Sequence, residues 1–565
     1  MARGWSFSRR AFADRVLNWP AARRRLKLSA ADTSRAGRTV LNSIPVTSES
    51  PAASPANNEN TPPSTAGMTT KVVKGSLWTL AGQVAPLGVS LFATPFVIRL
   101  LGAEGYGVLI LVSLIPTYLG FADLGMGLAS TKFASEAYAA GDAEREARTV
   151  RTAAVIALCT SVPVAVLVFL FSGRLVTLFN VPEHLAWEAS AALKVASVTF
   201  VLNFLNQIFN TPQLTRLRMD LNTFVNSGFR ILGIVATPIV IYLGGGILGA
   251  VIVLFAAALL TLGGHVYMSG RLLPPLFDIS LDRNAIRPLL KFGGAMGLSA
   301  VASVLLVNLE KLVLTRLTSV ENLAYYSVAF TLAGMTSLFS TAMIQSLIPA
   351  FSQLLNSGEE TELLFERSIV VNSIVLLPLL VFLAVIAKPF FTIWAGAEFG
   401  DASTFPFYVL LFGLGLNIPA IVPYSLLLAN GRTKTIARLY WGELVPYLFL
   451  TVVLTYYYGT VGAALAWSAR LVVDGTAFFL VSRRLLPAGR IKFKHSKTAL
   501  ILGALILVPP ALSIGVFENF VFQISIYAVA LAAFSTYVWR RVLLGEDRAW
   551  FVSRVGGVFG ERFSN

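Results

Sequence analysis

The sequence is dominated by successive apolar runs of about 20 residues, separated by short polar segments. An α-helix rises 1.5 Å per residue, so about 20 apolar residues cross the roughly 30 Å hydrocarbon core of a bilayer. The 565 residues are 55% hydrophobic and only 13% charged, with a mean hydropathy of +0.71. This pattern predicts an all-α polytopic membrane protein, because helices satisfy their backbone polar groups internally in lipid.

We expect about fourteen transmembrane helices from these runs. The expected spans are 76–98, 106–128, 152–172, 190–210, 223–243, 247–268, 292–314, 324–350, 369–393, 405–429, 437–457, 460–481, 498–516 and 520–541. An even number of crossings places both termini on the same side of the membrane.

The distribution of basic residues predicts which side that is. Alternate loops carry most of the Lys and Arg residues: Lys132, Arg145, Arg148, Arg151, Arg216, Arg218, Arg271, Arg283, Arg287, Lys291, Arg432, Lys434, Arg438, Arg483, Arg484, Arg490, Lys492, Lys494 and Lys497. The opposite loops hold little beyond Arg99, Arg174, Arg316 and Lys388. Because basic loops stay in the cytoplasm, we predict cytoplasmic termini. These loops also account for the formal charge of +16, so we expect membrane lipids and no nucleic acid as partners.

The two ends of the chain differ from the apolar middle. Residues 1–70 are rich in Arg, Pro, Ser, Thr and Asn, and contain too few apolar residues to fold. We interpret them as a disordered basic cytoplasmic tail, with translation from Met68 as an alternative. Residues 546–565 are expected to form a cytoplasmic C-terminal tail.

Short segments recur at a nearly constant offset and predict an internal repeat. Arg99-Leu100 and Glu104 recur as Arg316-Leu317 and Glu321. GILGA at 246–250 recurs in almost the same register as GTVGA at 459–463. We therefore expect two pseudo-symmetric six-helix bundles, at 71–270 and 271–482, followed by helices 13 and 14 within 483–545. The two bundles would be related by an axis along the membrane normal.

Several short motifs, in order, resemble those of a known transporter family. They are KGSLW at 74–78, RLLGAEGYG at 99–107, DLGMG at 123–127 and NGRTK at 430–434. These segments resemble the polysaccharide-transporter branch of the multidrug, oligosaccharidyl-lipid and polysaccharide exporter superfamily, the Wzx-like flippases. The resemblance covers about residues 71–541.

The resemblance implies a function and a location. It implies a flippase that moves an undecaprenyl-diphosphate-linked oligosaccharide across the bacterial inner membrane, for O-antigen, capsule or exopolysaccharide assembly. A polysaccharide polymerase or its chain-length machinery is an expected partner, and we expect a monomer. The motifs do not specify the glycan. Family members often carry acidic and basic residues at the positions of Asp123, Glu310 and Lys311.

Ionisable residues inside apolar runs are candidate site residues, because each costs a few kcal/mol in lipid unless it has a partner or water. Glu310 and Lys311 are adjacent, so their side chains point about 100° apart on a helix and each needs its own partner. Both a role in a central lumen and a structural inter-helix role stay open.

Arg470 and Asp474 are four residues apart and share a helix face, which leaves two interpretations. They form a structural bridge with each other, or Arg470 binds a diphosphate through its guanidinium fork. Arg230 and Glu443 occupy equivalent positions in the two copies of the repeat. They are therefore expected to face each other across a pseudo-symmetric lumen, or to be satisfied separately.

Amides recur at helical spacing in one run, at Asn203, Asn206 and Gln207, with Asn210 one turn further on. Such amides hydrogen-bond sugar hydroxyls, or they join neighbouring helices. Two interpretations apply to the aromatic residues, stacking on sugar rings and, as the main one, anchoring at the membrane surface. These residues are Tyr424, Tyr440, Trp441, Tyr447 and Trp467.

The sequence predicts no catalytic residues, no metal site and no organic cofactor. Cys159, the single cysteine, is expected to be a small buried apolar residue, and the three His residues are scattered. The chain contains no GxxxxGK[ST] motif, so energy input is expected from an ion gradient or from substrate flow. Four acidic residues are candidates for coupling to H⁺ or Na⁺: Asp123, Glu310, Glu443 and Asp474.

Two other functions compete with the flippase. A multidrug or small-metabolite antiporter uses the same scaffold, and an apolar, acid-lined lumen would favour it. A membrane-embedded polymerase or ligase would need a large outward loop with polar catalytic groups. The longest outward loops, 173–189 and 394–404, are short, which disfavours an enzyme.

Overall fold

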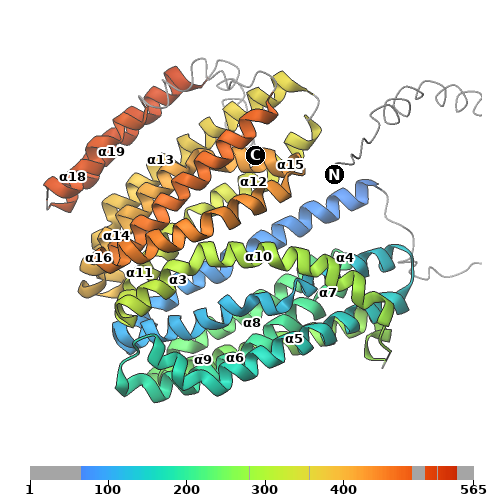
Figure 1. The fold of residues 1–565 in the computed structure, drawn as a ribbon. Helices are drawn as coiled ribbons and strands as arrows, with labels where there is room; N and C mark the ends of the chain where they lie inside the picture. Colours follow the sequence, from blue (N-terminus) through green and yellow to red (C-terminus); the bar gives the residue numbers. More distant parts are fainter. Residues whose placement is uncertain (1–64, 279, 355–356, 487–502, 518, 544–565) are drawn as a thin grey trace, which may run out of the picture. The chain divides into compact units, whose positions relative to one another are not determined.

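The computed structural model describes residues 65–278, 280–354, 357–486, 503–517 and 519–543 (Figure 1). The tails expected at 1–70 and 546–565 lie almost wholly outside these ranges, as does the start of the helix expected at 498. The described residues are helical and contain no β-strand, which confirms the all-α prediction.

A first group of helices precedes residue 273. It consists of α3 (Thr65–Tyr118), the short η1 (Leu119–Asp123), α4 (Met126–Ala139), α5 (Ala143–Leu178), α6 (Glu183–Phe209), α7 (Thr211–Thr215), α8 (Met219–Val240) and α9 (Gly246–Leu272). Within this group α5 packs on α6, α6 packs on α9, and α8 packs on both α3 and α9.

A second group follows. It consists of α10 (Arg283–Leu317), α11 (Val320–Met335), α12 (Ser337–Gln353), α13 (Gly358–Ala395), α14 (Ala397–Asn417), α15 (Ile421–Ala429) and α16 (Thr433–Ser482). Two further helices, α18 (Val508–Val516) and α19 (Phe520–Tyr537), pack on α13. The first part of α10 packs on α4 and α5, and α10 also packs on α16, so this helix contacts both groups (Figure 1).

Glycines divide the longest helices into two arms. At 1.5 Å per residue, the 50 residues of α16 would extend about 75 Å, well beyond one bilayer. Gly459, with φ 55° and ψ −128°, interrupts α16 in a conformation that glycine adopts without steric cost. Gly246, its counterpart in the repeat, has nearly the same backbone angles, φ 56° and ψ −152°. Helix starts repeat as well: α6 and α8 begin at 183 and 219, and α14 and α16 begin at 397 and 433, the same interval apart.

Repeated backbone angles and helix starts favour the internal repeat, and the boundaries of the two bundles stay a prediction. The number of crossings is also not settled by helix length. Eight helices in the described residues are long and apolar enough to span a bilayer, or nine if the bent pair α11–α12 is one span. Three of these exceed 45 residues, which is enough for two crossings of about 20 residues each.

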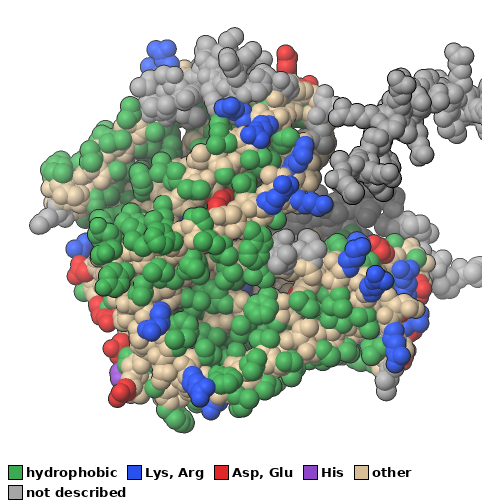
Figure 2. Space-filling view, viewed as in Figure 1, with side chains coloured by type: hydrophobic (Ala, Val, Ile, Leu, Met, Phe, Trp, Pro, Cys, Tyr) green, Lys and Arg blue, Asp and Glu red, His purple; other side chains and the backbone are tan. Residues whose placement is uncertain are grey.

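The surface and the helix lengths together make this a multi-pass membrane protein. Apolar side chains spread widely over the middle of the face drawn in Figure 2, as contact with lipid tails requires. Cys159 corrects one expectation, because it is exposed on α5 rather than buried. An apolar run in a membrane helix faces lipid as well as protein, so an apolar context does not imply burial.

The turns that follow alternate helices gather at one end, which we call the turn end. It is defined by Gly102, Asn180, Gly246, Ser319 and Gly396. Here Nε2 of His184 lies 3.4 Å from Oε2 of Glu104. Glu188 accepts a hydrogen bond from the backbone N–H of Leu248 at 3.0 Å.

Candidate functional site: an amide-lined cavity and a buried charge cluster

A cavity of about 920 Å³ lies inside the first group, between α3, α6, α8 and α9. Its polar lining consists of Ser90, Ser113, Thr117, Thr199, Asn203, Asn206, Gln207, Asn210, Asn226, Arg230 and Thr261. Arg230 is the one charged residue among the residues that line it. The cavity is therefore rich in neutral hydrogen-bonding groups and carries a single positive charge.

The amides reach this cavity because α6 repeats them every three or four residues, which places them on one helix face. Asn206 also donates its Nδ2 hydrogen to the backbone oxygen of Ala258 on α9, at 3.3 Å. The Oδ1 atoms of Asn206 and Asn210 are buried and accept no hydrogen bond from the described residues. Asn206 thus joins two helices and is also one of the residues that line the cavity.

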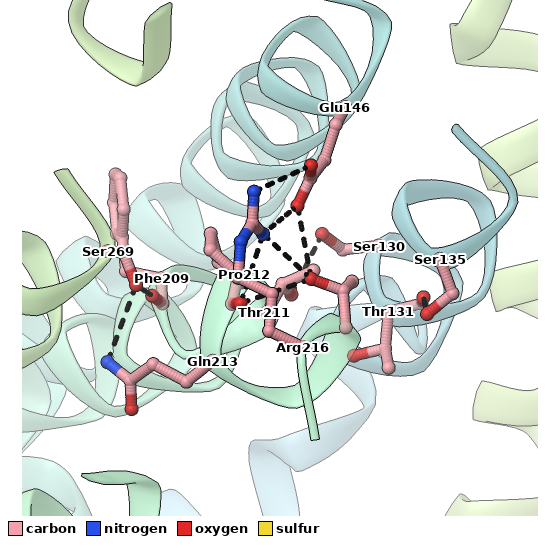
Figure 3. Close-up of polar contacts among 11 residues, drawn as sticks. Ser130, Thr131, Ser135, Glu146, Phe209, Thr211, Pro212, Gln213, Arg216 and Ser269 are labelled. Atoms are coloured by element: carbon pink, nitrogen blue, oxygen red, sulfur yellow. Dashed lines mark hydrogen bonds and ion pairs between the residues drawn. The ribbon is translucent and has the colours of Figure 1, made fainter. Parts of the chain in front are cut away.

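A buried polar network holds the short helix α7, which follows the amide row (Figure 3). Glu146 on α5 is fully buried, and Arg216 donates to both of its carboxylate oxygens, at 2.6 and 3.1 Å. Thr215 donates to the same carboxylate at 3.1 Å, and Thr211 donates to Ser130 on α4 at 3.1 Å. These bonds tie α7 to α4 and α5, so they fix where α6 ends.

The same corner is tied to α9. Ser269 donates to the backbone oxygen of Phe209 at 2.6 Å, and Gln213 donates to the Ser269 hydroxyl at 3.4 Å. His265 is fully buried, with Nδ1 3.3 Å from Gln213 Oε1. Nothing in the sequence indicated this network, because Glu146 and Arg216 both resemble solvated loop charges.

A second site lies in the second group, around Glu310. This residue is 0% exposed, and its Oε2 accepts a hydrogen bond from the Tyr447 hydroxyl of α16 at 2.8 Å. The guanidinium of Arg470 lies 5.6 Å from the Tyr447 ring centroid, where a cation is attracted to the aromatic face. Glu310 and Arg470 therefore approach the same tyrosine.

Lys311 has separate partners, as the adjacency of the two residues requires. Its Nζ donates to Asn308 Oδ1 at 2.8 Å and lies 4.0 Å from the centroid of the Phe330 ring on α11. The Tyr118 hydroxyl of α3 donates to the backbone oxygen of Asn308. The Lys311 partners thus connect α10 with α11 and with the first group.

Glu443, Arg470 and Asp474 complete this cluster. Glu443 comes from the first arm of α16, and the other two come from its second arm, beyond Gly459. All three side chains are buried, at 8–9% exposure, and Arg470 and Asp474 are one helical turn apart on α16. Neither oxygen of Glu443, nor Oδ1 of Asp474, nor Nε of Arg470 has a hydrogen-bond partner in the described residues.

The structure brings together some of the predicted residues and separates others. Five form the charge cluster: Glu310, Lys311, Glu443, Arg470 and Asp474. Four line the amide cavity: Asn203, Asn206, Gln207 and Arg230. Arg230 lines the amide cavity and Glu443 belongs to the charge cluster, and their facing each other across a lumen stays a prediction.

Two further expectations can be compared with the geometry. Among the described residues, no ion pair within 4.0 Å joins Arg470 to Asp474, although the two charges are neighbours. Asp123 ends η1 just before α4 and is not among the residues that line the amide cavity, and its buried Oδ1 has no partner in the described residues. Within the part of the chain that the structure describes, no three His, Cys, Asp or Glu side chains gather as a metal site would require.

Several partners in the cluster carry little signal in the sequence. Tyr447 is expected from sequence as a surface anchor, yet its ring is buried and its hydroxyl is bound to Glu310. Asn308 is identifiable from the sequence, because it is a polar residue one helical turn before Lys311. Phe330 is not, because nothing in the sequence distinguishes it from the other phenylalanines among the 39 in the chain.

Comparison with known proteins places the chain in a family. The model of a family described as "Polysaccharide biosynthesis protein" matches residues 72–355, half of the chain. The chain belongs to this family. It is 22% identical over 412 residues to a Shigella flexneri protein named "Putative O-antigen transporter", a match that covers 71% of this chain and 96% of the relative. It is also 24% identical over 383 residues to the succinoglycan biosynthesis transport protein ExoT of Rhizobium meliloti (strain 1021), covering 67% and 73%.

Two solved structures share the fold. One is an inward-facing multidrug resistance MATE family transporter of the MOP superfamily, with TM-score 0.63 and 16% identity, covering 71% of this chain and 94% of that one. The other is the lipid II flippase MurJ in an inward closed conformation, also with TM-score 0.63 and 16% identity, covering 83% and 99%. The family and fold agree with the resemblance that the sequence motifs indicated.

Proposed function

We propose that this protein is a flippase for a lipid-linked oligosaccharide. It moves an undecaprenyl-diphosphate-linked glycan, an O-antigen, capsule or exopolysaccharide unit, from the inner to the outer leaflet of a bacterial inner membrane. Both termini face the cytoplasm, and the basic loops with them. It acts as a transporter and catalyses no covalent step.

The observation that carries this proposal is the chemistry of the two sites. The cavity in the first group presents amides and hydroxyls, which hydrogen-bond sugars, and one guanidinium. Arg470 supplies a second guanidinium, which is buried, and its Nε has no partner in the described residues. A polar cavity lowers the cost of moving a hydrophilic head across hydrocarbon, and guanidinium groups suit diphosphate oxygens.

Relatives support the same function. An O-antigen transporter and a succinoglycan transport protein are named for glycan export, and a lipid II flippase shares the fold. We propose that the glycan enters from the inner leaflet while its prenyl tail stays in lipid. The two helix groups then rearrange, so that the polar sites open to the other side.

Coupling and partners belong to the same proposal. Asp123, Glu310, Glu443 and Asp474 stay candidates for H⁺ or Na⁺ coupling, and no other cofactor is required. A monomer is sufficient, since both sites lie within one chain. A polysaccharide polymerase would receive the glycan in the outer leaflet.

An antiporter of drugs or small metabolites is the second candidate. The shared fold with a multidrug transporter and the acidic cluster around Glu443 favour it. Such an antiporter would accept organic cations, so the two functions predict opposite preferences for the charge of the substrate. The same experiment therefore separates them.

The test uses the full chain in proteoliposomes that contain a fluorescent prenyl-diphosphate disaccharide. Flipping is read as the fraction of glycan that becomes accessible to an added glycosidase. We expect R470A and R230A to reduce the initial rate by about 10- to 100-fold, since a hydrogen bond to a charged group contributes about 1.5–3 kcal/mol.

R316A is the matched control. Arg316 is exposed at the turn end, and its backbone oxygen, which the substitution keeps, accepts from Asn180. Its rate should equal that of the unmodified protein, and all variants should reach the same level in the membrane. Rates that R470A and R230A leave unchanged, or transport of an organic cation in place of the glycan, would contradict the flippase.

A further inference from the structure

The amide row of α6 contains two kinds of side chain. Asn206 is buried and donates to the backbone oxygen of Ala258 on α9 at 3.3 Å, so it joins two helices. Asn203 and Gln207 are exposed, line the amide cavity and form no hydrogen bond with other described residues. Because they are four residues apart, they share one helix face, about 6 Å apart along the helix axis. These two amides are therefore available to a ligand.

The second helix group shows that packing alone does not explain the amide of Gln207. Counted from the starts of α6 at 183 and α14 at 397, the counterpart of Asn203 is Asn417. Asn417 donates to the backbone oxygen of Leu471 at 2.6 Å. The counterpart of Gln207 is Ile421, and both counterparts line a cavity of about 140 Å³. An apolar side chain thus fits the equivalent place in the fold.

The two hydroxyls that α3 contributes to the amide cavity can only accept hydrogen bonds. Ser113 and Thr117 are exposed and line the cavity, one helical turn apart. Ser113 donates to the backbone oxygen of Leu109, and Thr117 donates to that of Ser113, both at 2.9 Å. A hydroxyl has a single hydrogen, so both oxygens have only lone pairs left. A ligand that binds to them must therefore be a donor.

Two further hydroxyls of the cavity are in the same state. Thr199 on α6 donates to the backbone oxygen of Val195 at 3.0 Å. Thr261 on α9 donates to that of Ala257 at 2.8 Å. Four hydroxyl oxygens from three helices thus line the cavity as acceptors.

The charge of the cavity restricts the ligand further. Arg230 is exposed, and within the part of the chain that the structure describes it forms no ion pair within 4.0 Å. The residues that line the cavity include no Asp or Glu. An organic cation would meet a guanidinium and no carboxylate, so the cavity suits a neutral or acidic ligand.

Sugars with free hydroxyls match this combination of groups. Each sugar hydroxyl can donate its hydrogen to a serine or threonine oxygen, and its oxygen can accept from an amide N–H. A carboxamide presents a donor and an acceptor side by side, so it can pair with two neighbouring hydroxyls of one ring. Ionised phosphate oxygens only accept, so a diphosphate does not satisfy the hydroxyls of α3. The sugar and the diphosphate of one substrate therefore need different partners.

We propose that α3 and α6 form a sugar site that selects a glycan by its unsubstituted hydroxyl groups. Four side chains make up this sugar site: Ser113, Thr117, Asn203 and Gln207. It takes neutral or acidic sugars whose hydroxyls are free, and it discriminates against sugars whose hydroxyls carry methyl or acyl groups. The inference rests on the proposed function for its substrate, and it assigns the choice of glycan to the first helix group.

The first experiment tests the sugar site without lipid or diphosphate. Titrations by saturation-transfer NMR measure the affinity of the full-length protein, in lipid nanodiscs, for the neutral disaccharide cellobiose. The comparison is fully O-methylated cellobiose, which keeps every oxygen and has no hydroxyl hydrogen. We expect cellobiose to bind about 5- to 150-fold more tightly, the range that corresponds to two neutral hydrogen bonds.

Variants of α3 locate the effect. S113A/T117V removes both acceptors, so it should weaken cellobiose binding by the same factor and leave the methylated sugar unchanged. S525A/T536V is the matched control. Ser525 and Thr536 are exposed on α19, donate to backbone oxygens four residues earlier, and are not among the residues that line the amide cavity. This control should bind cellobiose as the unmodified protein does.

A variant of α6 guards against loss of folding. Q207I introduces the residue type that Ile421 already provides at the equivalent place of the second group. We expect about 2- to 12-fold weaker cellobiose binding and an unchanged unfolding temperature. If S113A/T117V does not fold, Q207I decides. Equal affinities in the unmodified protein and the variants, or no binding of cellobiose to the unmodified protein, overturn the sugar site.

The second experiment tests selection during transport. Proteoliposomes contain a prenyl-diphosphate disaccharide with free or with O-methylated hydroxyls, each with a fluorophore on its outer sugar. Flipping is read as the fraction of fluorophore reduced by dithionite, which does not cross the membrane. We expect the free form to flip about 5- to 150-fold faster, and S113A/T117V to narrow this difference. R470A should lower both rates equally, since both substrates carry the same diphosphate.

The outcomes separate this inference from the proposed function. Equal flipping rates of the two glycans in the unmodified protein overturn selection by hydroxyls and leave the flippase intact. A difference that S113A/T117V leaves unchanged also overturns it, because the methyl groups are then excluded by size at another place. If neither glycan is flipped, the proposed function fails, and the binding of cellobiose decides the sugar site.

Discussion

At the scale of single residues, the Tyr447 hydroxyl supplies the hydrogen bond that stabilises the buried carboxylate of Glu310 inside the second helix group. Glu310 is fully buried, its Oε2 accepts from Tyr447, and its Oε1 has no partner in the described residues. A buried acceptor that loses its donor retains the full cost of desolvation, about 1–3 kcal/mol and more for a charged group. Tyr447 is thus a stabilising residue as well as a neighbour of the proposed substrate-binding Arg470.

Replacing Tyr447 with Phe tests this role. Y447F removes one oxygen and keeps the ring that packs near Arg470, so we expect the free energy of unfolding to fall by at least about 1–3 kcal/mol. Denaturant unfolding of the purified protein in detergent measures it. Y457F is the control, because the Tyr457 side chain is 72% exposed. Equal stability of Y447F and Y457F would show that Glu310 does not depend on this bond.

The charged residues of the site are easy to predict from the sequence, but the partners that they contact are not. Glu310, Lys311, Glu443, Arg470 and Asp474 stand out in the sequence because an ionisable residue in an apolar run is rare. Their partners depend on which helix faces meet, and periodicity along one helix does not contain that information. The cluster forms because Gly459 folds the two arms of α16, and because α10 packs on α16.

At the scale of helices, the short α7 is held by the buried pair Glu146 and Arg216. Removing one partner of a buried pair leaves an uncompensated charge and typically costs about 3–5 kcal/mol. We therefore expect E146A to destabilise the protein by about this amount, as measured by thermal unfolding. E146Q should cost less, since Gln can still accept from Arg216.

An exposed pair in the same region provides the comparison. Glu136 and Lys132 lie 3.4 Å apart on α4, with side chains about half exposed. Such surface pairs contribute about 0–1 kcal/mol, so E136A should leave the unfolding temperature nearly unchanged. Equal effects of E136A and E146A would mean that the bonds to α7 do not brace this corner.

Helix positions are predictable from the apolar runs, and helix ends are not. The apolar run at 152–172 lies inside α5, but α5 runs from 143 to 178 because the Asp142 side chain caps its first turn by accepting from the backbone N–H of Arg145. Hydropathy reports only the part of a helix in contact with hydrocarbon, whereas the helix continues into the polar loop. The amide row of α6 is predictable from its spacing, and the cavity it lines needs the packing of α3, α8 and α9.

At the scale of the whole molecule, the two helix groups are joined near the turn end. Arg99 donates to the backbone oxygen of Ile393 at 2.6 Å, and Trp394 donates to that of Leu91 at 2.8 Å. Asn180 donates to the backbone oxygen of Arg316 at 2.9 Å. Alternating access requires the groups to part at this end during each cycle. In the proposed transport cycle these three bonds would therefore break before the glycan leaves.

A covalent link across this end should stop transport. Cysteines are introduced at Leu91 and Trp394 in a C159A background, which removes the single native thiol, and are joined by a short bifunctional reagent. We expect the cross-linked protein to bind farnesyl diphosphate but to lose flipping in proteoliposomes, because the groups cannot part. A reducible linker should restore transport once it is cleaved.

The matched control joins two helices of one group. Ser172 on α5 and Ser190 on α6 have hydroxyl oxygens 3.0 Å apart, so S172C and S190C are positioned for the same treatment. Linking helices that move together should leave the flipping rate unchanged, provided that the first group moves as a rigid unit. Transport that survives the Leu91–Trp394 link, or that is lost equally in both proteins, would contradict an alternating-access cycle that opens at the turn end.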